Sequence, residues 1–176
     1  ATGGLVAARS EDDGVTWKIL SRIPVAPGHR SYQYHEPHAV QAADGTVVVH
    51  IRKNYPKTAR TLQVTSRDRG ATWSVPEEVY WGYPSHLLRL KDGRLLATYG
   101  YRKAPLGIRA SVSTDHGRHW GGEVILADKA TSGDMGYPAT VELPDGTFLT
   151  VWYAKSKASP EAVLKTTRWE LAHHEK

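Results

Sequence analysis

Two residues with complementary acid–base chemistry occupy equivalent places in a repeat of this sequence. Glu36 and Tyr137 each lie eight residues before the aspartate of an Asp-Gly pair, and each is followed by a proline, Pro37 or Pro138. Pro84 holds the same place in the middle repeat. A phenol, with a pKa of about 10, becomes a nucleophile only when a base stands beside it. If the repeats are structurally equivalent, we expect both side chains to point into one pocket.

The Asp-Gly pairs themselves predict β-hairpins. They are Asp44-Gly45, Asp92-Gly93 and Asp145-Gly146, at spacings of 48 and 53 residues. Each precedes a short run rich in β-branched and aromatic residues, at 47–51, 95–101 and 148–153. Asp-Gly between apolar runs favours a two-residue type I′ turn, with positive φ at both central positions. We therefore expect a type I′ hairpin at each pair.

A second repeat interleaves with the first. The segments 10–17, 66–73 and 113–120 all fit S-x-D-x-G-x-[TH]-W, and their glycines lie 56 and 47 residues apart. In such a box the aspartate can accept hydrogen bonds from turn amides, and the tryptophan can pack against the neighbouring sheet. We expect the boxes to stabilise hairpin turns, and we assign them no catalytic role.

The whole pattern predicts an all-β chain. No window has sustained helical periodicity, and 162–171 fits either a helix or a closing strand. Two hairpins per ~50 residues are typical of four-stranded antiparallel propeller blades. We expect a partial β-propeller of about three blades over 1–171, half of a six-bladed ring, followed by a frayed tail at 172–176.

Composition excludes several classes of function. The 176 residues include 23 Lys and Arg, 18 Asp and Glu and no Cys, for a net charge of +5. The basic residues are scattered, so nucleic acid is not an expected partner. No apolar run approaches a membrane span, and 1–10 lacks the pattern of a signal peptide. His35, His38 and His86 lack carboxylate or thiol partners at ligand spacing, so we expect neither a metal nor another cofactor.

These boxes and turns resemble the sialidase (neuraminidase) superfamily, whose six-bladed propellers carry the Asp-box or BNR repeat. The resemblance spans most of the chain and implies the carboxy-terminal half of such a propeller. It implies an exo-acting, retaining glycoside hydrolase with Tyr137 as nucleophile and Glu36 as its base. A neutral phenol avoids the repulsion that a carboxylate nucleophile would meet at an anionic sugar.

The resemblance also implies arginines that bind the substrate carboxylate. Arg52 stands at the family's spacing, sixteen residues beyond the glutamate. A further arginine is expected at the place of Pro105, which Arg102 and Arg109 flank. The family's first arginine and its acid/base aspartate belong to amino-terminal blades that this chain does not contain.

Two histidines add a second set of candidates. His38 and His86 are equivalent by their distance from the Asp-Gly pairs, so they should share the channel face and contribute to ligand binding. Two other functions stay open at this point. One is a non-catalytic carbohydrate-binding or scaffold propeller, and the other is a different polysaccharide-degrading enzyme that uses His38 or His86.

The expected partner is a glycan, with an acidic sugar favoured by the arginines. A half ring leaves sheet faces open, so a homodimer that closes the propeller is a further expectation. The residues leave the compartment open, and the resemblance is compatible with a secreted or periplasmic protein.

Overall fold

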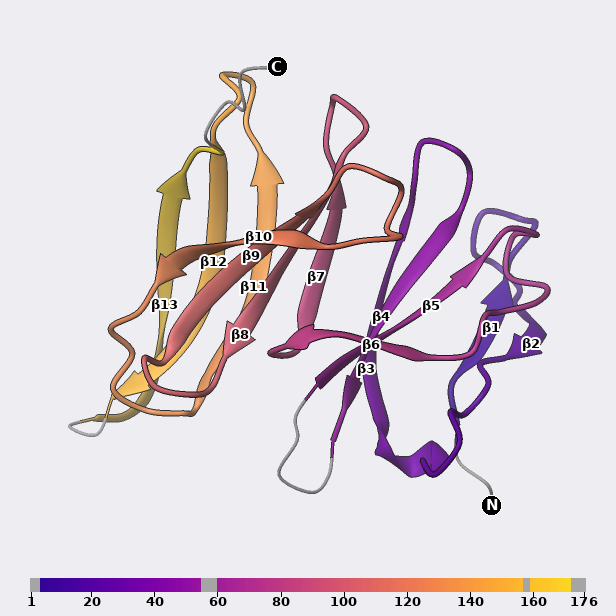
Figure 1. The fold of residues 1–176 in the computed structure, drawn as a ribbon, viewed down its shortest axis with the longest axis horizontal. Coiled ribbons are helices and arrows are strands. Elements are labelled where there is room, and N and C mark those ends of the chain that lie inside the picture. The colour runs from indigo at the N-terminus through magenta and orange to yellow at the C-terminus, as the bar shows by residue number, and fades with distance from the viewer. Residues whose placement is uncertain (1–3, 55–59, 157–158, 172–176) are drawn as a thin grey trace.

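The computed structural model describes residues 4–54, 60–156 and 159–171 (Figure 1). In this part of the chain the regular elements are β-strands and one short 3₁₀ turn, η1 (Ser31–Gln33). The all-β prediction is therefore confirmed. The segment that fitted either a helix or a strand forms β13 (Ser159–Trp169). The expected tail at 172–176 lies outside the described residues.

The strands form four antiparallel sheets that follow one another along the chain (Figure 1). The first sheet holds β1 (Val6–Arg9) and β2 (Lys18–Arg22). The second runs β3 (Tyr34–Gln41), β4 (Val47–Lys53), β5 (Arg60–Ser66) and β6 (Glu77–Trp81). The third runs β7 (Ser85–Arg89), β8 (Leu95–Tyr101), β9 (Gly107–Ser113) and β10 (Gly121–Ala127). The fourth holds β11 (Met135–Glu142), β12 (Phe148–Ser156) and β13.

This arrangement is a partial propeller, as the two repeats predicted. The second, third and fourth sheets each begin with an inner strand, and these strands, β3, β7 and β11, contact one another in that order. The two four-stranded sheets are complete blades, the fourth sheet has three described strands, and the first has two. The equivalent residues of β3, β7 and β11 therefore face a shared channel.

The Asp-Gly pairs do connect the first and second strands of each blade, but the expected turn type is wrong. Gly45 N–H donates to Ala42 O at 3.0 Å, and Ala42 N–H donates to Thr46 O at 2.8 Å. Gly45 has φ +87°, whereas Asp44 is not among the residues with positive φ. These bonds describe a three-residue loop with a type I turn and a glycine bulge. The same bonds recur around Gly93 and Gly146.

The φ pattern of a type I′ turn occurs in the boxes instead. Asp13 and Gly14 have φ of 55° and 89°, and Val15 N–H donates to Asp12 O at 3.2 Å. Asp12 Oδ1 accepts a hydrogen bond from the Thr16 amide at 2.8 Å, so the aspartate side chain also closes the loop. The other two boxes repeat this geometry at 68–72 and 115–119.

Each later box also ties its sheet to the sheet before it. Trp73 Nε1 donates to Ser21 Oγ at 3.0 Å, and Trp120 Nε1 donates to Gln63 Oε1 at 2.8 Å. Trp17, in the first box, donates to Gly14 O within its own box and is 64% exposed. The tryptophan therefore packs between sheets wherever a preceding sheet is described.

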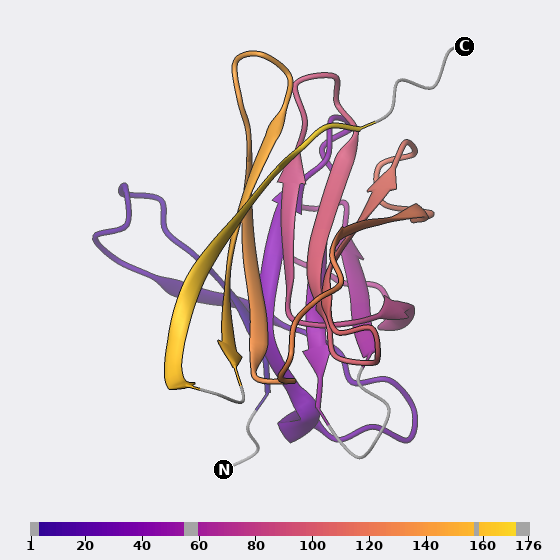
Figure 2. The same ribbon diagram turned by 90° about the vertical axis from the view of Figure 1, so that its left-hand side faces the viewer.

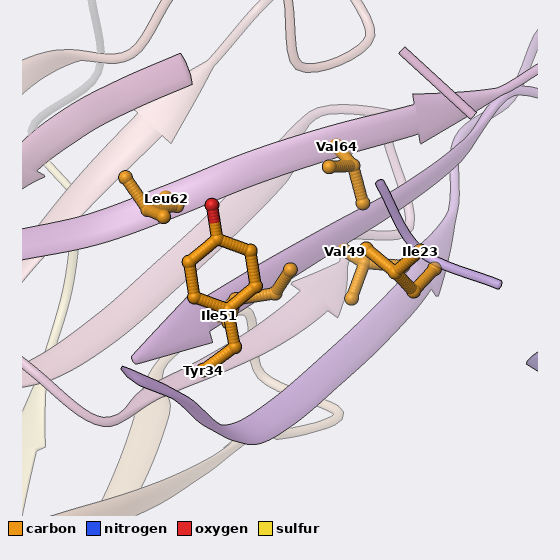
Figure 3. Packing of buried hydrophobic residues seen from close by; sticks show 6 residues of the cluster. All are labelled: Ile23, Tyr34, Val49, Ile51, Leu62 and Val64. Carbon is orange, nitrogen blue, oxygen red and sulfur yellow. The ribbon is translucent and has the colours of Figure 1, made fainter. Parts of the chain in front are cut away.

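Apolar side chains fill the space between neighbouring sheets. Figure 3 shows one such cluster, built from β3, β4, β5 and the residue that follows β2: Ile23, Tyr34, Val49, Ile51, Leu62 and Val64. Three further clusters fill the spaces toward β13. This packing fixes each inner strand relative to the next and so positions the residues of the channel.

The two ends of the described stack carry exposed apolar side chains. Val15, Trp17 and Ile19 are exposed on the first sheet. On β13, Val163 and Leu164 are exposed, and in Figure 2 no other described strand lies in front of this strand. A cavity of about 350 Å³ lies between β1–β2 and β3–β4.

No described residues form a helix with the length and apolar character needed to cross a bilayer.

Candidate functional site

Glu36 and Tyr137 occupy β-bulges on equivalent inner strands. The register with the paired strand shifts between His35 and His38 in β3, and between Gly136 and Ala139 in β11. Glu36 has φ +46° and Tyr137 has φ +51°, a left-handed conformation that costs residues other than glycine about 1–2 kcal/mol. Bulges re-aim side chains and are common next to functional sites. Both side chains are thereby turned toward the channel.

The prolines after these residues suit the bulges. Proline has no N–H and is confined in sheets to edges, first positions and bulges. Pro37 and Pro138 each follow the residue with positive φ, so the ladder has no amide to satisfy at that point. The shared residue-proline pair is thus the local signal for the shared bulge.

The bulges bring the phenol and the carboxylate into direct contact. Tyr137 Oη donates to Glu36 Oε1 at 2.6 Å. Arg52 Nη1 donates to both Glu36 oxygens, at 2.9 and 3.0 Å, and lies 3.2 Å from Tyr137 Oη. The three side chains form one hydrogen-bonded cluster, hereafter the Tyr-Glu-Arg cluster, that joins β3, β4 and β11.

The cluster is partly open to solvent. The Tyr137 residue is 47% exposed, and the side chains of Glu36 and Arg52 are 34% and 15% exposed. Burial raises the pKa of the Tyr137 phenol, and the hydrogen bond and charge of Glu36 raise that pKa further. Arg52 and Arg102 act in the opposite direction on this pKa. The phenol is therefore protonated at neutral pH and has an acceptor in place for its proton.

Arg102 lies beside this cluster. Its guanidinium carbon is 5.2 Å from the centre of the Tyr83 ring, and that of Arg52 is 4.5 Å from the same centre. A Cβ on Gly136 would lie 3.6 Å from Arg102 Nη2, so this guanidinium runs directly against the residue before Tyr137. The structure therefore places Arg102, three residues before the expected position at Pro105, close enough to Tyr137 to act on the pKa of its phenol.

Arg109 requires a correction, because the structure does not bring it to the Tyr-Glu-Arg cluster. Only 2% of Arg109 is exposed, and it donates to the carbonyl oxygens of Pro105, Ile108 and Ala127. Its guanidinium also lies 4.7 Å from the centre of the Tyr101 ring. These contacts hold the 102–106 loop and β10 to β9, so Arg109 has a structural role.

His38 and His86 connect neighbouring inner strands. Their rings lie 4.6 Å apart. His38 Nδ1 accepts the Leu87 amide at 3.2 Å, and His86 Nδ1 accepts the Thr140 amide at 3.4 Å. Burial lowers the pKa of both rings, that of His86 to about 4 with a contribution from His38. Both are neutral at pH 7, and the described contacts join them to the blades and not to the Tyr-Glu-Arg cluster.

His35, the remaining histidine of the metal hypothesis, is exposed. Across the described residues, no three His, Cys, Asp or Glu side chains come together as a group that could hold a metal ion.

Two tyrosines at the site were not among the site residues predicted from the sequence. Tyr83 immediately precedes Pro84, the middle-repeat equivalent of Glu36, and that adjacency was the available signal. Tyr153 lies eight residues after Asp145, as Arg52 does after Asp44. Its ring centre is 5.8 Å from that of Tyr137.

Tyr153 belongs to a second phenol and carboxylate pair. Tyr153 Oη donates to Asp134 Oδ1 at 2.7 Å, and Lys155 Nζ lies 2.9 Å from Asp134 Oδ2. The Tyr153 hydrogen bond is the largest cause that lowers the pKa of Asp134, followed by the one from Lys155. This pair extends the polar wall of the site along β12.

The family of BNR repeat-like domains matches residues 3–150 of the chain. The chain belongs to this family. A search of curated proteins found no match. The recognition of a BNR-repeat propeller from the boxes and turns is therefore confirmed.

Solved structures similar to this BNR repeat-like chain include a protein of unknown function from Dyadobacter fermentans. It is 30% identical, with a TM-score of 0.82, over 93% of this chain and 44% of that chain. The NanB sialidase from Streptococcus pneumoniae is 23% identical, with a TM-score of 0.69, over 97% and 28% of the two chains. An α-L-arabinanase from Penicillium chrysogenum is 20% identical, with a TM-score of 0.67, over 92% and 52%.

The two glycosidases show a shared fold, and the fold of this chain is that of glycoside hydrolases. The chain spans about half the length of the first structures that it matches.

Proposed function

We propose that this BNR repeat-like chain carries the nucleophile and base of a retaining, exo-acting, sialidase-like glycoside hydrolase. The observation that supports it most directly is the Tyr-Glu-Arg cluster. A phenol that donates to a carboxylate at 2.6 Å has its proton acceptor in place before the substrate arrives.

In the proposed reaction, Tyr137 Oη attacks the anomeric carbon of the sugar while the bond from that carbon to the leaving-group oxygen breaks. The phenol proton passes to Glu36. The leaving oxygen takes a proton from an acid on a part of the ring that the described residues do not form. Water then attacks the same carbon and gives a proton to the conjugate base of that acid, while the bond to Tyr137 Oη breaks. Glu36 returns its proton to the phenol oxygen, and the two displacements together retain the configuration.

The charges around the phenol favour an acidic sugar. Arg52 and Arg102 both lie against the Tyr83 ring, beside the nucleophile. A substrate carboxylate next to the reacting carbon would be repelled by a carboxylate nucleophile but attracted by these guanidiniums. This feature favours a sialoside over the neutral arabinose sugars named for some of the similar structures.

The test is turnover of a fluorogenic sialoside by the closed propeller that contains this chain. Tyr137→Phe should lower turnover by at least about a hundredfold, since it removes the attacking oxygen. A fluorinated sialoside that slows the second step should add its mass to the peptide that carries Tyr137. Tyr32→Phe, which alters an exposed phenol, is the matched control.

Unchanged turnover in Tyr137→Phe would overturn the proposal. Saturable binding of the glycan with no cleavage would instead support a non-catalytic carbohydrate-binding propeller.

A further inference from the structure

The Tyr83 ring contacts two arginines at once. We propose that Tyr83 is a positioning residue that holds Arg52 and Arg102 together as one receptor for a single carboxylate group. This inference rests on the proposed function. It assigns Tyr83 to the site and gives a structural reason why the site would prefer an acidic sugar. The guanidinium carbons lie 4.5 and 5.2 Å from the ring centre, within the range of cation–π attraction.

The two guanidiniums differ in their other partners. Arg52 donates to Glu36 and is tied to the reacting phenol. Arg102 makes no hydrogen bond and no ion pair with any residue in the described part of the chain, although it is only partly exposed. Partly buried charges without a partner are costly. Arg102 is therefore a cation next to the nucleophile that has no directly bonded anion among the described residues, although its charge contributes to lowering the pKa of Asp134.

The Tyr83 ring can explain why the Nε edges of Arg52 and Arg102 are buried without a hydrogen-bond partner. The Nε atoms of Arg52 and Arg102 are buried and have no hydrogen-bond partner. A guanidinium is weakly hydrated and stacks on aromatic faces, so a ring can cover its Nε edge while its Nη atoms stay available. Two like charges held close repel each other, and the negative faces of one ring offset part of that repulsion.

The backbone holds Tyr83 rigidly in this place. Tyr83 N–H donates to Gly100 O at 2.9 Å. A Cβ on Gly100 would lie 2.8 Å from Tyr83 O and 3.3 Å from Gly136 Cα, which is closer than side chains tolerate. Glycine at this position lets the start of β7 and the start of β11 converge. The ring therefore meets the guanidiniums from a fixed support.

The ligand that fits this receptor is planar and singly charged. A carboxylate accepts two parallel N–H bonds from one guanidinium, or one from each of two. Because Arg102 runs against Gly136, the bound carboxylate would lie beside the residue that precedes Tyr137. An acidic sugar with its carboxylate on the reacting carbon meets both requirements.

Calorimetric titration with N-acetylneuraminic acid and with its methyl ester tests the proposal, since the ester replaces the charged carboxylate by a neutral group and leaves the rest of the sugar unchanged. The wild-type propeller should bind the acid at least about tenfold more tightly than the ester. Tyr83→Leu, which removes the ring, should abolish this preference and raise KM far more than it lowers kcat. Tyr83→Phe, which keeps the ring, should rescue both.

Arg102→Gln serves as a second variant in case Tyr83→Leu does not fold. It removes an unpartnered charge, so it should leave the thermal unfolding midpoint unchanged or higher and still abolish the preference for the acid. The proposal would be overturned if Tyr83→Leu lost as much affinity for the ester as for the acid. It would also be overturned if Tyr83→Phe lost the preference for the acid as Tyr83→Leu does.

This result is separable from the proposed catalysis. A propeller that prefers the acid but does not cleave the sialoside would support the carboxylate receptor and contradict the proposed hydrolase. Cleavage of the sialoside without any preference for the acid would support the proposed hydrolase and contradict the carboxylate receptor.

Discussion

The phenol oxygen of Tyr137 lies 2.6 Å from the carboxylate of Glu36, although 101 residues separate the two in the chain. Both residues are bulged, both have positive φ and both precede a proline. The contact therefore arises from one local conformation that occurs in both β3 and β11. These two inner strands lie on either side of β7, the inner strand of the blade between them.

After burial, this contact is the main cause of the raised pKa of the phenol. Glu36→Gln removes the negative charge and a strong acceptor, both of which raise the pKa of Tyr137. The pKa of the phenol should therefore fall in this variant, even though catalysis is lost with the base. The tyrosinate absorbance, titrated as a difference from Tyr137→Phe, measures the shift. A higher pKa in Glu36→Gln would contradict the contact.

The boxes should differ in their contribution to stability according to what lies before them. Trp73 bonds to Ser21 on the preceding sheet, whereas Trp17 bonds within its own box and is 64% exposed. We expect Trp73→Ala to lower the free energy of unfolding by about 2–3 kcal/mol and Trp17→Ala by less than about 1 kcal/mol. Urea unfolding of the isolated chain measures both, and equal losses would argue against packing between sheets.

Acid should destabilise the fold before the carboxylates titrate. His50 is fully buried, 3.0 Å from Gln63 Oε1, and burial lowers its pKa to about 3. An unfolded histidine titrates near pH 6.5, so between these values the unfolded chain binds a proton that the fold excludes. Stability should be complete above pH 6.5 and fall by up to about 1.4 kcal/mol per pH unit below it for His50 alone.

Urea midpoints at pH 7.5 and pH 5 measure this loss. His50→Gln should reduce the pH dependence but not remove it, because burial also lowers the pKa of His38 and His86, and the exposed His35→Gln should leave it intact. If stability is level from pH 7.5 to pH 5, then His50 is not held neutral by the fold.

Gly100 should tolerate no side chain. Its added Cβ would meet the backbone of Tyr83 and Gly136, so Gly100→Ala must separate the start of β7 from β11. We expect a loss of about 1–3 kcal/mol in the free energy of unfolding, as in overpacked cores, together with weaker binding of acidic sugars. The control is Gly121→Ala, whose Cβ would meet nothing within 4 Å. Equal behaviour of the two variants would refute the close approach.

The isolated chain should pair with a second copy. Apolar side chains are exposed at both ends of the stack, on the first sheet and on β13, and the similar structures are about twice as long. Light scattering should give a mass near twice 19.5 kDa, and Leu164→Glu should give a monomer because it places a charge on one end face. A monomeric wild-type chain would show that the end faces do not meet.

The sequence alone indicated much of the site because repeats and strands have simple periods. Counting from each Asp-Gly pair placed Glu36 and Tyr137 in one pocket, and the spacing implied by the family resemblance added Arg52. The structure brings the three side chains into one cluster. The same count would have placed Tyr153 opposite Arg52. Strands alternate strictly, so residues at equal distances from equivalent turns occupy equivalent places in every blade.

Only the tertiary structure could choose between Arg102 and Arg109. Arg102 directly follows β8 and Arg109 lies near the start of β9, so both flank the expected position at Pro105. Arg109 turns into carbonyl oxygens of its own blade, whereas Arg102 runs along Gly136 of the next one. The turn types were similarly beyond the sequence, because Asp-Gly serves both kinds of turn and the strand ends decide which one forms.

The sequence by itself therefore determined the blades and the equivalence of their inner-strand residues, since both follow from local repeats. The tertiary structure decided which arginine faces the phenol and gave Tyr83 its place between the blades. Those features depend on close contacts between β7, β8 and β11, and such contacts are set by packing between segments far apart in the chain.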